Sequence, residues 1–218
     1  MTLILTTIRP TEVLITSDGR SVTTQDGKVT GVKDDLQKIF PIPDHPVAIV
    51  HHGENILDGK PVGEFIAKFI ARQNTGNMSI LDLADELRHA AHAAVRKRLF
   101  DVRGESGCGL LVAGFSSHQK GPQVVEVFWK LEKEALNTQE HKWVAGSMIA
   151  SGSGQKQIPK LDADRAIKGS VAEAQAYHAE LMKAACEADV QNNTVGGHVH
   201  ELLIAPAKWE WTHAPKKP

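Results

Sequence analysis

The sequence predicts an α+β fold with four layers, in which two β-sheets pack face to face and helices cover their outer faces. Strand-like segments come first, long helical segments follow, and strands return before a last helix and a closing strand. This order suits an α-β-β-α sandwich. With 218 residues and 41% apolar composition, the chain has enough material for one large core. We therefore expect a single domain over residues 1–218, ending in a tail at about residues 206–218.

The first part of the chain predicts a β-hairpin. Two runs rich in apolar and β-branched residues, Leu3–Ile8 and Val13–Thr16, are separated by a turn at Pro10. The polar segment 21–35 contains two glycines and is expected to form a hairpin or an extended loop. Lys38–Ile42 is expected to form a short strand.

The middle of the chain predicts one buried strand and two amphipathic helices. Val47–His51 is a continuous apolar run, as expected for a sheet that is covered on its inner face. Helices are expected over Ile56–Arg72 and Ser79–Leu99, joined by a loop at 74–77. The second helix begins with a Ser-x-x-Asp capping pair and repeats apolar residues at helical spacing.

The second half of the chain alternates apolar runs with glycine-rich or polar turns. It predicts three strands, one long helix and a closing strand: Cys108–Phe115, Val124–Leu131, Trp143–Ala150, Val171–Ala188 and His198–Ile204. The tail contains Trp209 and Trp211. Two such tryptophans suit a subunit contact, or they cap the core of their own chain.

Thr2 is chemically unusual because it stands at the tip of the first strand. Initiator methionine is usually removed before a small residue, which would leave Thr2 with a hydroxyl and an α-amine on adjacent carbons. A hydroxyl is a weak nucleophile that needs a base, and an α-amine with a pKa near ~8 can accept its proton. One residue would then supply both nucleophile and base. The alternative is that Thr2 only begins a strand.

Thr2, the hairpin, Ser17-Asp18-Gly19-Arg20 and Lys38-Ile39-Phe40-Pro41-Ile42 together resemble the proteasome β-subunit superfamily of N-terminal nucleophile hydrolases. That family has an N-terminal threonine, an aspartate sixteen residues later and a lysine in a strand motif; Asp18 has this spacing here. Lys38 falls a few residues late, which implies a longer connection around Thr23–Thr30. The resemblance is greatest to the bacterial HslV-like branch, including the betaproteobacterial proteasome homologues. It covers most of the chain and implies the four-layer sandwich of that family.

The resemblance implies further site residues. In the family, a glycine after the central strand offers its backbone N–H to the oxyanion; His52 takes this place, with Gly53 next, so the N–H is kept while a side chain crowds the site. Ser151-Gly152-Ser153-Gly154 resembles the motif whose serine binds the N-terminal amine, which implies that role for Ser153. The alternative for this segment is a plain glycine-rich turn.

A last motif follows the long helix. The family carries Arg-Asp, two residues, Ser and Gly-Gly, whereas this chain has Ala188-Asp189, a longer gap through 191–193, and then Thr194-Val195 before Gly-Gly. Asp189 is therefore expected to support the site. Either Thr194 or Val195 occupies the place of the family serine.

Composition excludes several classes of partner. Lysine and arginine number 25 and aspartate and glutamate 26, so the net charge of −1 gives no electrostatic reason to expect a nucleic acid or an anionic membrane. No apolar run approaches the length of a membrane span, and we expect no signal segment before the first strand. Cys108 and Cys186 are far apart and match no metal spacing. We expect a cytoplasmic protein with reduced thiols.

Histidine pairs offer a rival interpretation as metal ligands. His89 and His92 are three apart on a predicted helix, and His198 and His200 alternate on a predicted strand. No glutamate completes a metalloprotease helix motif, so we interpret them as solvated or hydrogen-bonded side chains. Asp162-Ala163-Asp164 lacks the remaining ligands of a calcium loop. We predict no metal and no cofactor.

The resemblance implies an N-terminal threonine endopeptidase. Lys38 would supply positive charge beside Thr2, Asp18 would orient Lys38, and Ser153 and Asp189 would position the amine. Family members stack into double rings of identical subunits that degrade unfolded polypeptides; six or seven subunits per ring, and an ATP-dependent unfoldase partner, stay open. Two alternatives remain: a catalytically inactive scaffold or binding ring of the same fold, and the same chemistry acting on a small amide.

Overall fold

The computed structural model describes residues 2–25, 28–72, 78–102, 107–132, 135–189 and 194–215. The fold is mixed, with about 32% of residues in helices and 40% in strands, so the prediction that both kinds of element share one chain is confirmed. Three expectations lie outside the described residues: the removal of Met1, the loop at 74–77 and the gap at 191–193.

The first sheet has five strands in the order β12-β1-β2-β13-β14, and all neighbours are antiparallel. Its strands are β1 (Ile4–Ile8), β2 (Val13–Ser17), β12 (Ser147–Ser151), β13 (His200–Ala205) and β14 (Lys208–His213). Every residue of β1 and β2 is buried, so the predicted hairpin forms the centre of this sheet.

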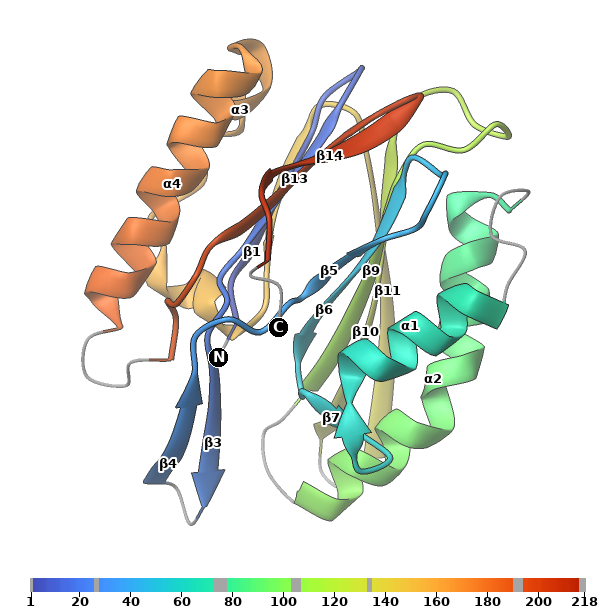
Figure 1. The fold of residues 1–218 in the computed structure, drawn as a ribbon, viewed down its shortest axis with the longest axis vertical. Helices are drawn as coiled ribbons and strands as arrows, with labels where there is room; N and C mark the ends of the chain where they lie inside the picture. The colour runs from blue at the N-terminus through green and yellow to red at the C-terminus, as the bar shows by residue number, and fades with distance from the viewer. Residues whose placement is uncertain are drawn as a thin grey trace.

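The second sheet also has five antiparallel strands, in the order β11-β10-β9-β6-β5. Its strands are β5 (Ile39–Pro41), β6 (Val47–Gly53), β9 (Gly107–Gly114), β10 (Gln123–Glu132) and β11 (Ala135–Val144). A separate hairpin of β3 (Ser21–Gln25) and β4 (Lys28–Lys33) projects away from both sheets (Figure 1). The segment 21–35, expected to form a hairpin or an extended loop, thus contains this hairpin.

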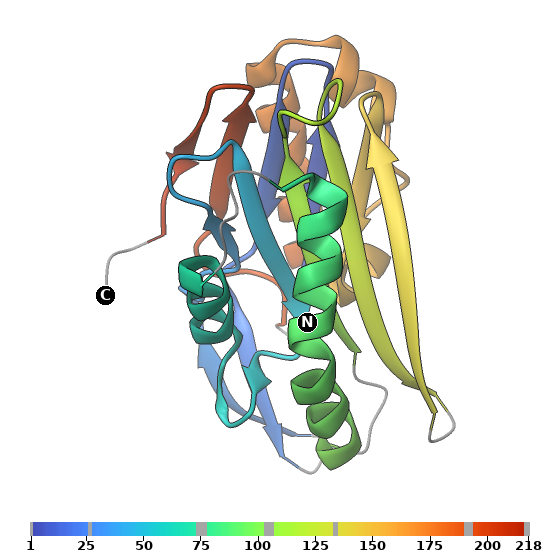
Figure 2. The same cartoon turned by 90° about the vertical axis from the view of Figure 1, so that its right-hand side faces the viewer.

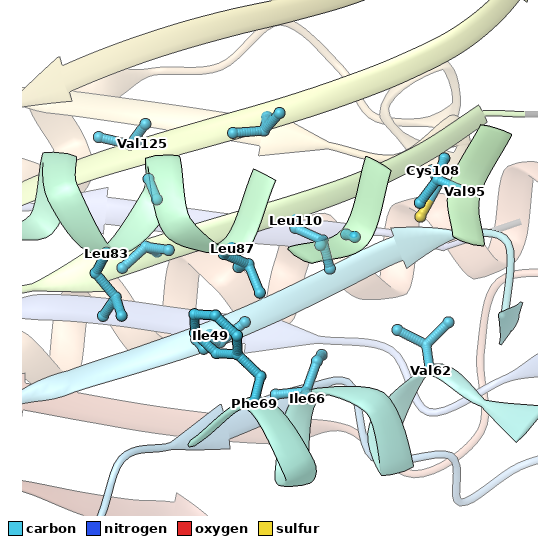
Figure 3. Packing of buried hydrophobic residues seen from close by; sticks show 14 of the residues in the cluster. Ile49, Val62, Ile66, Phe69, Leu83, Leu87, Val95, Cys108, Leu110 and Val125 are labelled. Atoms are coloured by element: carbon cyan, nitrogen blue, oxygen red, sulfur yellow. The ribbon is translucent and has the colours of Figure 1, made fainter. Parts of the chain in front are cut away.

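Helices cover the outer face of each sheet (Figures 1 and 2). The helices α1 (Val62–Arg72) and α2 (Ile80–Val102) pack on the second sheet through a cluster that includes Ile49, Phe69 and Leu87 (Figure 3). The helices α3 (Ala163–Lys168) and α4 (Val171–Ala188) cover the first sheet. A third cluster lies between the two sheets and joins residues of β1, β2 and β13 to residues of β5, β6, β9 and β10.

Two sequence predictions were wrong in their bounds. The first helix begins at Val62 rather than Ile56, because Asp58 and Gly59 both have positive φ and turn a short hairpin of β7 (Ile56–Leu57) and β8 (Lys60–Pro61). The strand expected over Trp143–Ala150 is the end of β11, a turn, and most of β12. The start of β11 has no apolar alternation, because that strand is almost entirely exposed.

The C-terminal segment is not a free tail. Residues 208–213 form β14 at the edge of the first sheet, and both tryptophans pack against the cluster between the sheets. The Trp209 indole N–H donates a hydrogen bond of 2.9 Å to the carbonyl of Ile42. Of the two alternatives, the structure therefore shows the tryptophans capping their own core. No helix in the described part of the chain is long and apolar enough to cross a membrane.

A buried polar network ties α4 to the first sheet. Thr16 donates its hydroxyl proton to Glu201 Oε2 at 2.9 Å, so at 2.7 Å it accepts from Nδ1–H of His178. His178 Nε2 then accepts from the Thr7 hydroxyl at 2.8 Å. Burial lowers the pKa of His178 to about 4, although the nearby Glu201 carboxylate opposes this. The network therefore holds a neutral imidazole in one tautomer.

This neutral histidine makes stability depend on pH. Below the ordinary pKa of 6.5 the unfolded chain binds a proton that folded His178 refuses until about pH 4. The free energy of unfolding should thus fall with decreasing pH through this window, by about 1.4 kcal/mol per pH unit from His178. When the free energy of unfolding is measured with urea at pH values between 7 and 5, its slope against pH should be shallower for His178→Gln than for the wild type. His92→Gln, on the exposed face of α2, is the control, and equal slopes in all three proteins would contradict the assignment.

Candidate active site

The start of β1 is held by the residue that follows β2. Backbone pairing continues one step beyond the strands, because the Asp18 N–H donates to the Leu3 carbonyl at 3.1 Å. The Leu3 N–H in turn donates to the Asp18 carboxylate at 2.9 Å. Asp18 is 1% exposed. A buried carboxylate therefore lies directly beside the Thr2-Leu3 peptide.

Lys38 supplies the cation for this carboxylate. Its ammonium lies 2.8 Å from Asp18 Oδ1 and donates a second hydrogen bond of 2.8 Å to the Arg20 carbonyl. The Lys38 side chain is fully buried. Burial lowers the pKa of Lys38, while the charge and hydrogen bond of Asp18 act in the opposite direction. The segment that follows β2 and the segment that leads into β5 thus meet at one ion pair.

Thr2 lies against the glycine-rich turn after β12. The Gly154 N–H donates a hydrogen bond of 2.9 Å to the Thr2 carbonyl. Gly152 has φ 87°, and a Cβ there would lie 2.3 Å from the same carbonyl, so only glycine permits this approach. Thr2 itself is 1% exposed. Ser153, between the two glycines, is exposed, and its side chain has no hydrogen-bond partner among the residues that the structure describes.

Asp189 ends α4 and organises the next loop. Its Oδ2 accepts hydrogen bonds from the Thr194 N–H at 2.6 Å, the Thr194 hydroxyl at 2.6 Å and the Val195 N–H at 2.8 Å. Of the two residues that the sequence left open, Thr194 thus bonds Asp189 through its hydroxyl and its backbone N–H, and Val195 bonds it through its backbone N–H alone.

The Asp189 loop reaches the Asp18 pair through backbone groups. The Gly196 N–H lies 3.4 Å from Asp18 Oδ2, and the Gly19 N–H donates to the Gly196 carbonyl at 3.1 Å. Val195 also packs beside Gly154, close to Leu3. The loop therefore links both buried carboxylates to the start of β1.

His52 and Gly53 come from the second sheet. His52 is 3% exposed, and the position of a Cβ on Gly152 would be 3.5 Å from the His52 Cβ, so His52 faces the Thr2 turn. Its Nε2 lies 2.7 Å from Glu126 of β10. Glu126 was missed in the sequence. The available signal was a single acidic residue within the apolar run Val124–Trp129.

The structure thus brings some of the predicted site residues into contact and leaves others at the edge of the group. Thr2, Asp18 and Lys38 form one continuous set of contacts through the Leu3 backbone, and Asp189 joins it through Gly196. Ser153 and His52 adjoin the set only across the glycine-rich turn. The arrangement places a hydroxyl, a buried cation and two buried carboxylates at one end of the first sheet.

No protein-family model matches this sequence, and no curated protein matches it significantly.

The buried ion pair predicts strong energetic coupling. Lys38→Met should destabilise the fold by about 3–5 kcal/mol, because it leaves the Asp18 carboxylate buried without a cation. The double variant Lys38→Met, Asp18→Asn should cost clearly less than the two single changes together. Urea unfolding of the four proteins measures this coupling.

Lys168→Met is the matched control, because Lys168 makes a 2.7 Å contact with Asp164 in which both side chains are exposed. It should leave the urea midpoint unchanged. Additive losses for Lys38 and Asp18 would show that the pair is not coupled.

Proposed function

We propose that the protein is an N-terminal threonine endopeptidase. After removal of Met1, the Thr2 hydroxyl is the nucleophile and the Thr2 α-amine is the base. The observation that carries the proposal is the fully buried Lys38–Asp18 pair, hydrogen-bonded to the residue next to Thr2. A buried ion pair gives little net stability compared with apolar residues, so its place beside the Thr2-Leu3 peptide favours a chemical role.

The reaction proceeds in two steps. The Thr2 oxygen bonds to the substrate carbonyl carbon while its proton passes to the α-amine. The scissile C–N bond then breaks, and the leaving amine takes up this proton. Water next attacks the Thr2 ester. The Thr2 α-amine takes a proton from this water and passes it to the Thr2 oxygen. Every proton is carried by groups of Thr2, and no cofactor takes part.

The ion pair tunes the base. A positive charge near an amine disfavours its protonated form and so lowers the pKa of the amine. Lys38 supplies that charge, and Asp18 fixes the ammonium while also holding the Leu3 N–H. The amine is then neutral, and competent as a base, at lower pH than an isolated α-amine would be.

Backbone and hydroxyl groups complete the site. The N–H groups at His52 and Gly53 are the proposed donors to the oxyanion, where fixed dipoles are worth several kcal/mol. Ser153 and Asp189 are the proposed partners of the amine. The triple hydrogen bonding of Asp189 to Thr194 and Val195 supports a fixed position for that carboxylate.

The order of helices and sheets supports the N-terminal nucleophile hydrolase sandwich as the fold type, with residues 1–218 as one proteasome-β-like domain. On this proposal the subunits assemble into a homo-oligomeric double ring, with six or seven copies per ring. The two rings would enclose a chamber that confines the nucleophile and admits only unfolded polypeptide, and the protein would act in the cytoplasm. An ATP-dependent unfoldase would be its natural partner.

A second candidate function is a catalytically inactive scaffold or binding ring of the same fold. One observation favours it: Thr2 is 1% exposed, so its hydroxyl is enclosed in this structure. The two functions make opposite predictions for peptide cleavage and share their predictions for assembly.

Substitution of the nucleophile separates them. Thr2→Ala should abolish cleavage of fluorogenic peptides and leave the thermal midpoint unchanged, because the hydroxyl serves chemistry and not packing. Thr11→Ala, an exposed threonine in the β1–β2 turn, should keep full activity. Intact mass should show active protein without Met1. Full turnover in Thr2→Ala, or activity with Met1 retained, would refute the mechanism.

A further inference from the structure

Each of the two large sheets has two edge strands, and three of these four edges are protected against pairing with another chain. The edge strand β5 has only three residues and includes Pro41. The pairing of β14 with β13 shifts register between Glu201 and Leu202. The strand β12 is mostly buried, and α3 packs against it. Short length, proline, irregular pairing and cover are usual means of keeping a sheet edge from pairing.

The fourth edge strand, β11, has none of these protections. Its ten residues pair with β10 without a shift of register, and its sequence contains no proline. Almost all of these residues are exposed, and Figure 2 shows the strand at the free edge of the second sheet. Within the described part of the chain, β10 is the only strand that pairs with β11. The outward N–H and C=O groups of this regular edge are therefore available to another strand.

The side chains of β11 divide between two faces, and this division restricts what can pair with it. Leu136 packs against the cluster beneath α1 and α2, whereas Trp143 packs against the cluster between the sheets. Successive side chains alternate between the faces. The face of Leu136 therefore also carries Thr138, Glu140, Lys142 and Val144. In a continued sheet, each of these side chains must lie opposite a residue of the same face.

Two opposite charges on one face favour a single register for pairing β11 with its own copy. Glu140 and Lys142 are two residues apart and are both exposed, and their side chains lie 2.8 Å apart. A two-fold axis at either of these residues would place two like charges opposite each other, which is unfavourable. An axis at His141 instead places Glu140 opposite Lys142 of the second copy, and it does so twice.

The same axis also matches the uncharged side chains. It places Thr138 opposite Val144 of the second copy, and such β-branched pairs stabilise a sheet. Val144 has an exposed fraction of 57%, the highest of any large apolar side chain in the described residues. On the other face, Gln139 comes opposite Trp143 of the second copy. Residues 138–144 of both strands are then paired without a like-charge contact.

We propose that β11 is the docking surface for β11 of a second copy of this chain, in an antiparallel pair with its two-fold axis at His141. The pairing joins two five-stranded sheets into one continuous sheet. Main-chain hydrogen bonds supply the affinity, and the contacts between Glu140 and Lys142 set the register. In a double ring, where contacts within each ring are heterologous, such a two-fold contact joins one ring to the other.

Charge reversal tests the register of this pair. Glu140→Lys places a lysine opposite Lys142 of the second copy, and like charges across an interface cost several kcal/mol. The particle mass from light scattering at micromolar protein should therefore halve, whether the wild type is a dimer or a double ring. Lys142→Glu should have the same effect. The double variant Glu140→Lys, Lys142→Glu restores opposite charges and should restore the wild-type mass.

The edge strand β14 offers a matched control. Lys208 and Glu210 are also two residues apart, and their exposed side chains lie 3.5 Å apart. Glu210→Lys should leave the mass at its wild-type value. A wild-type mass for Glu140→Lys, a double variant that stays dissociated, or wild-type protein that is monomeric at every concentration would overturn the pairing.

A disulfide locates the axis directly and covers the case that a charge variant does not fold. His141 lies opposite its own copy, so the two Cα atoms are about 4.5–5.5 Å apart, a distance that a disulfide spans. His141→Cys should therefore form a covalent dimer under mild oxidation. Cys186→Ser serves as the background, because it removes the exposed native thiol.

Gln139→Cys in the same background is the register control. Its two copies are offset by four residues along the strands, or about 13 Å, so they should not form a disulfide. Dimers from Gln139→Cys, or none from His141→Cys, would contradict the axis. These experiments measure association and not cleavage, so their outcome is separate from that of the peptidase function.

Discussion

A lysine side chain with no exposure to water requires a partner, and in this protein that requirement brings three N-terminal segments together. Lys38 finds its partner in Asp18 and shares the Arg20 carbonyl. Three chain segments must therefore meet: the start of β1, the turn after β2 and the approach to β5. Because removing one partner would leave a charge buried alone, this meeting point tolerates little change.

The remaining parts of the site are arranged around that fixed point by backbone contacts. The turn at Gly152–Gly154 closes on the Thr2 carbonyl, and the loop after α4 closes on Asp18 through Gly196. These turns depend on the absence of side chains. On the second sheet, by contrast, the large rings of His52 and Phe128 stack on each other. Thr2 and Asp18 therefore come from the first sheet, and Lys38, His52 and Gly53 come from the strands of the second sheet or from the segment that leads into it.

Much of this could be predicted from sequence, and what failed has physical causes. The β1–β2 hairpin, β6 and α2 follow from apolar periodicity. The contact between Asp18 and Lys38 was implied by the resemblance to proteasome β-subunits. The exposed β11 gave no such signal. Glu126 could not be assigned, because its bond to His52 joins positions 74 residues apart and depends on which strands become neighbours. Pairing across a sheet is settled by the packing of the whole chain.

The central claim is that Thr2 carries both nucleophile and base, and covalent labelling tests it most directly. A peptide epoxyketone closes a ring only on a residue with a hydroxyl and a free amine on adjacent carbons, which here means processed Thr2. Intact mass and peptide mapping after incubation with assembled protein should show one adduct per subunit, confined to Thr2. Unlabelled protein, or an adduct on any other residue, would contradict the account.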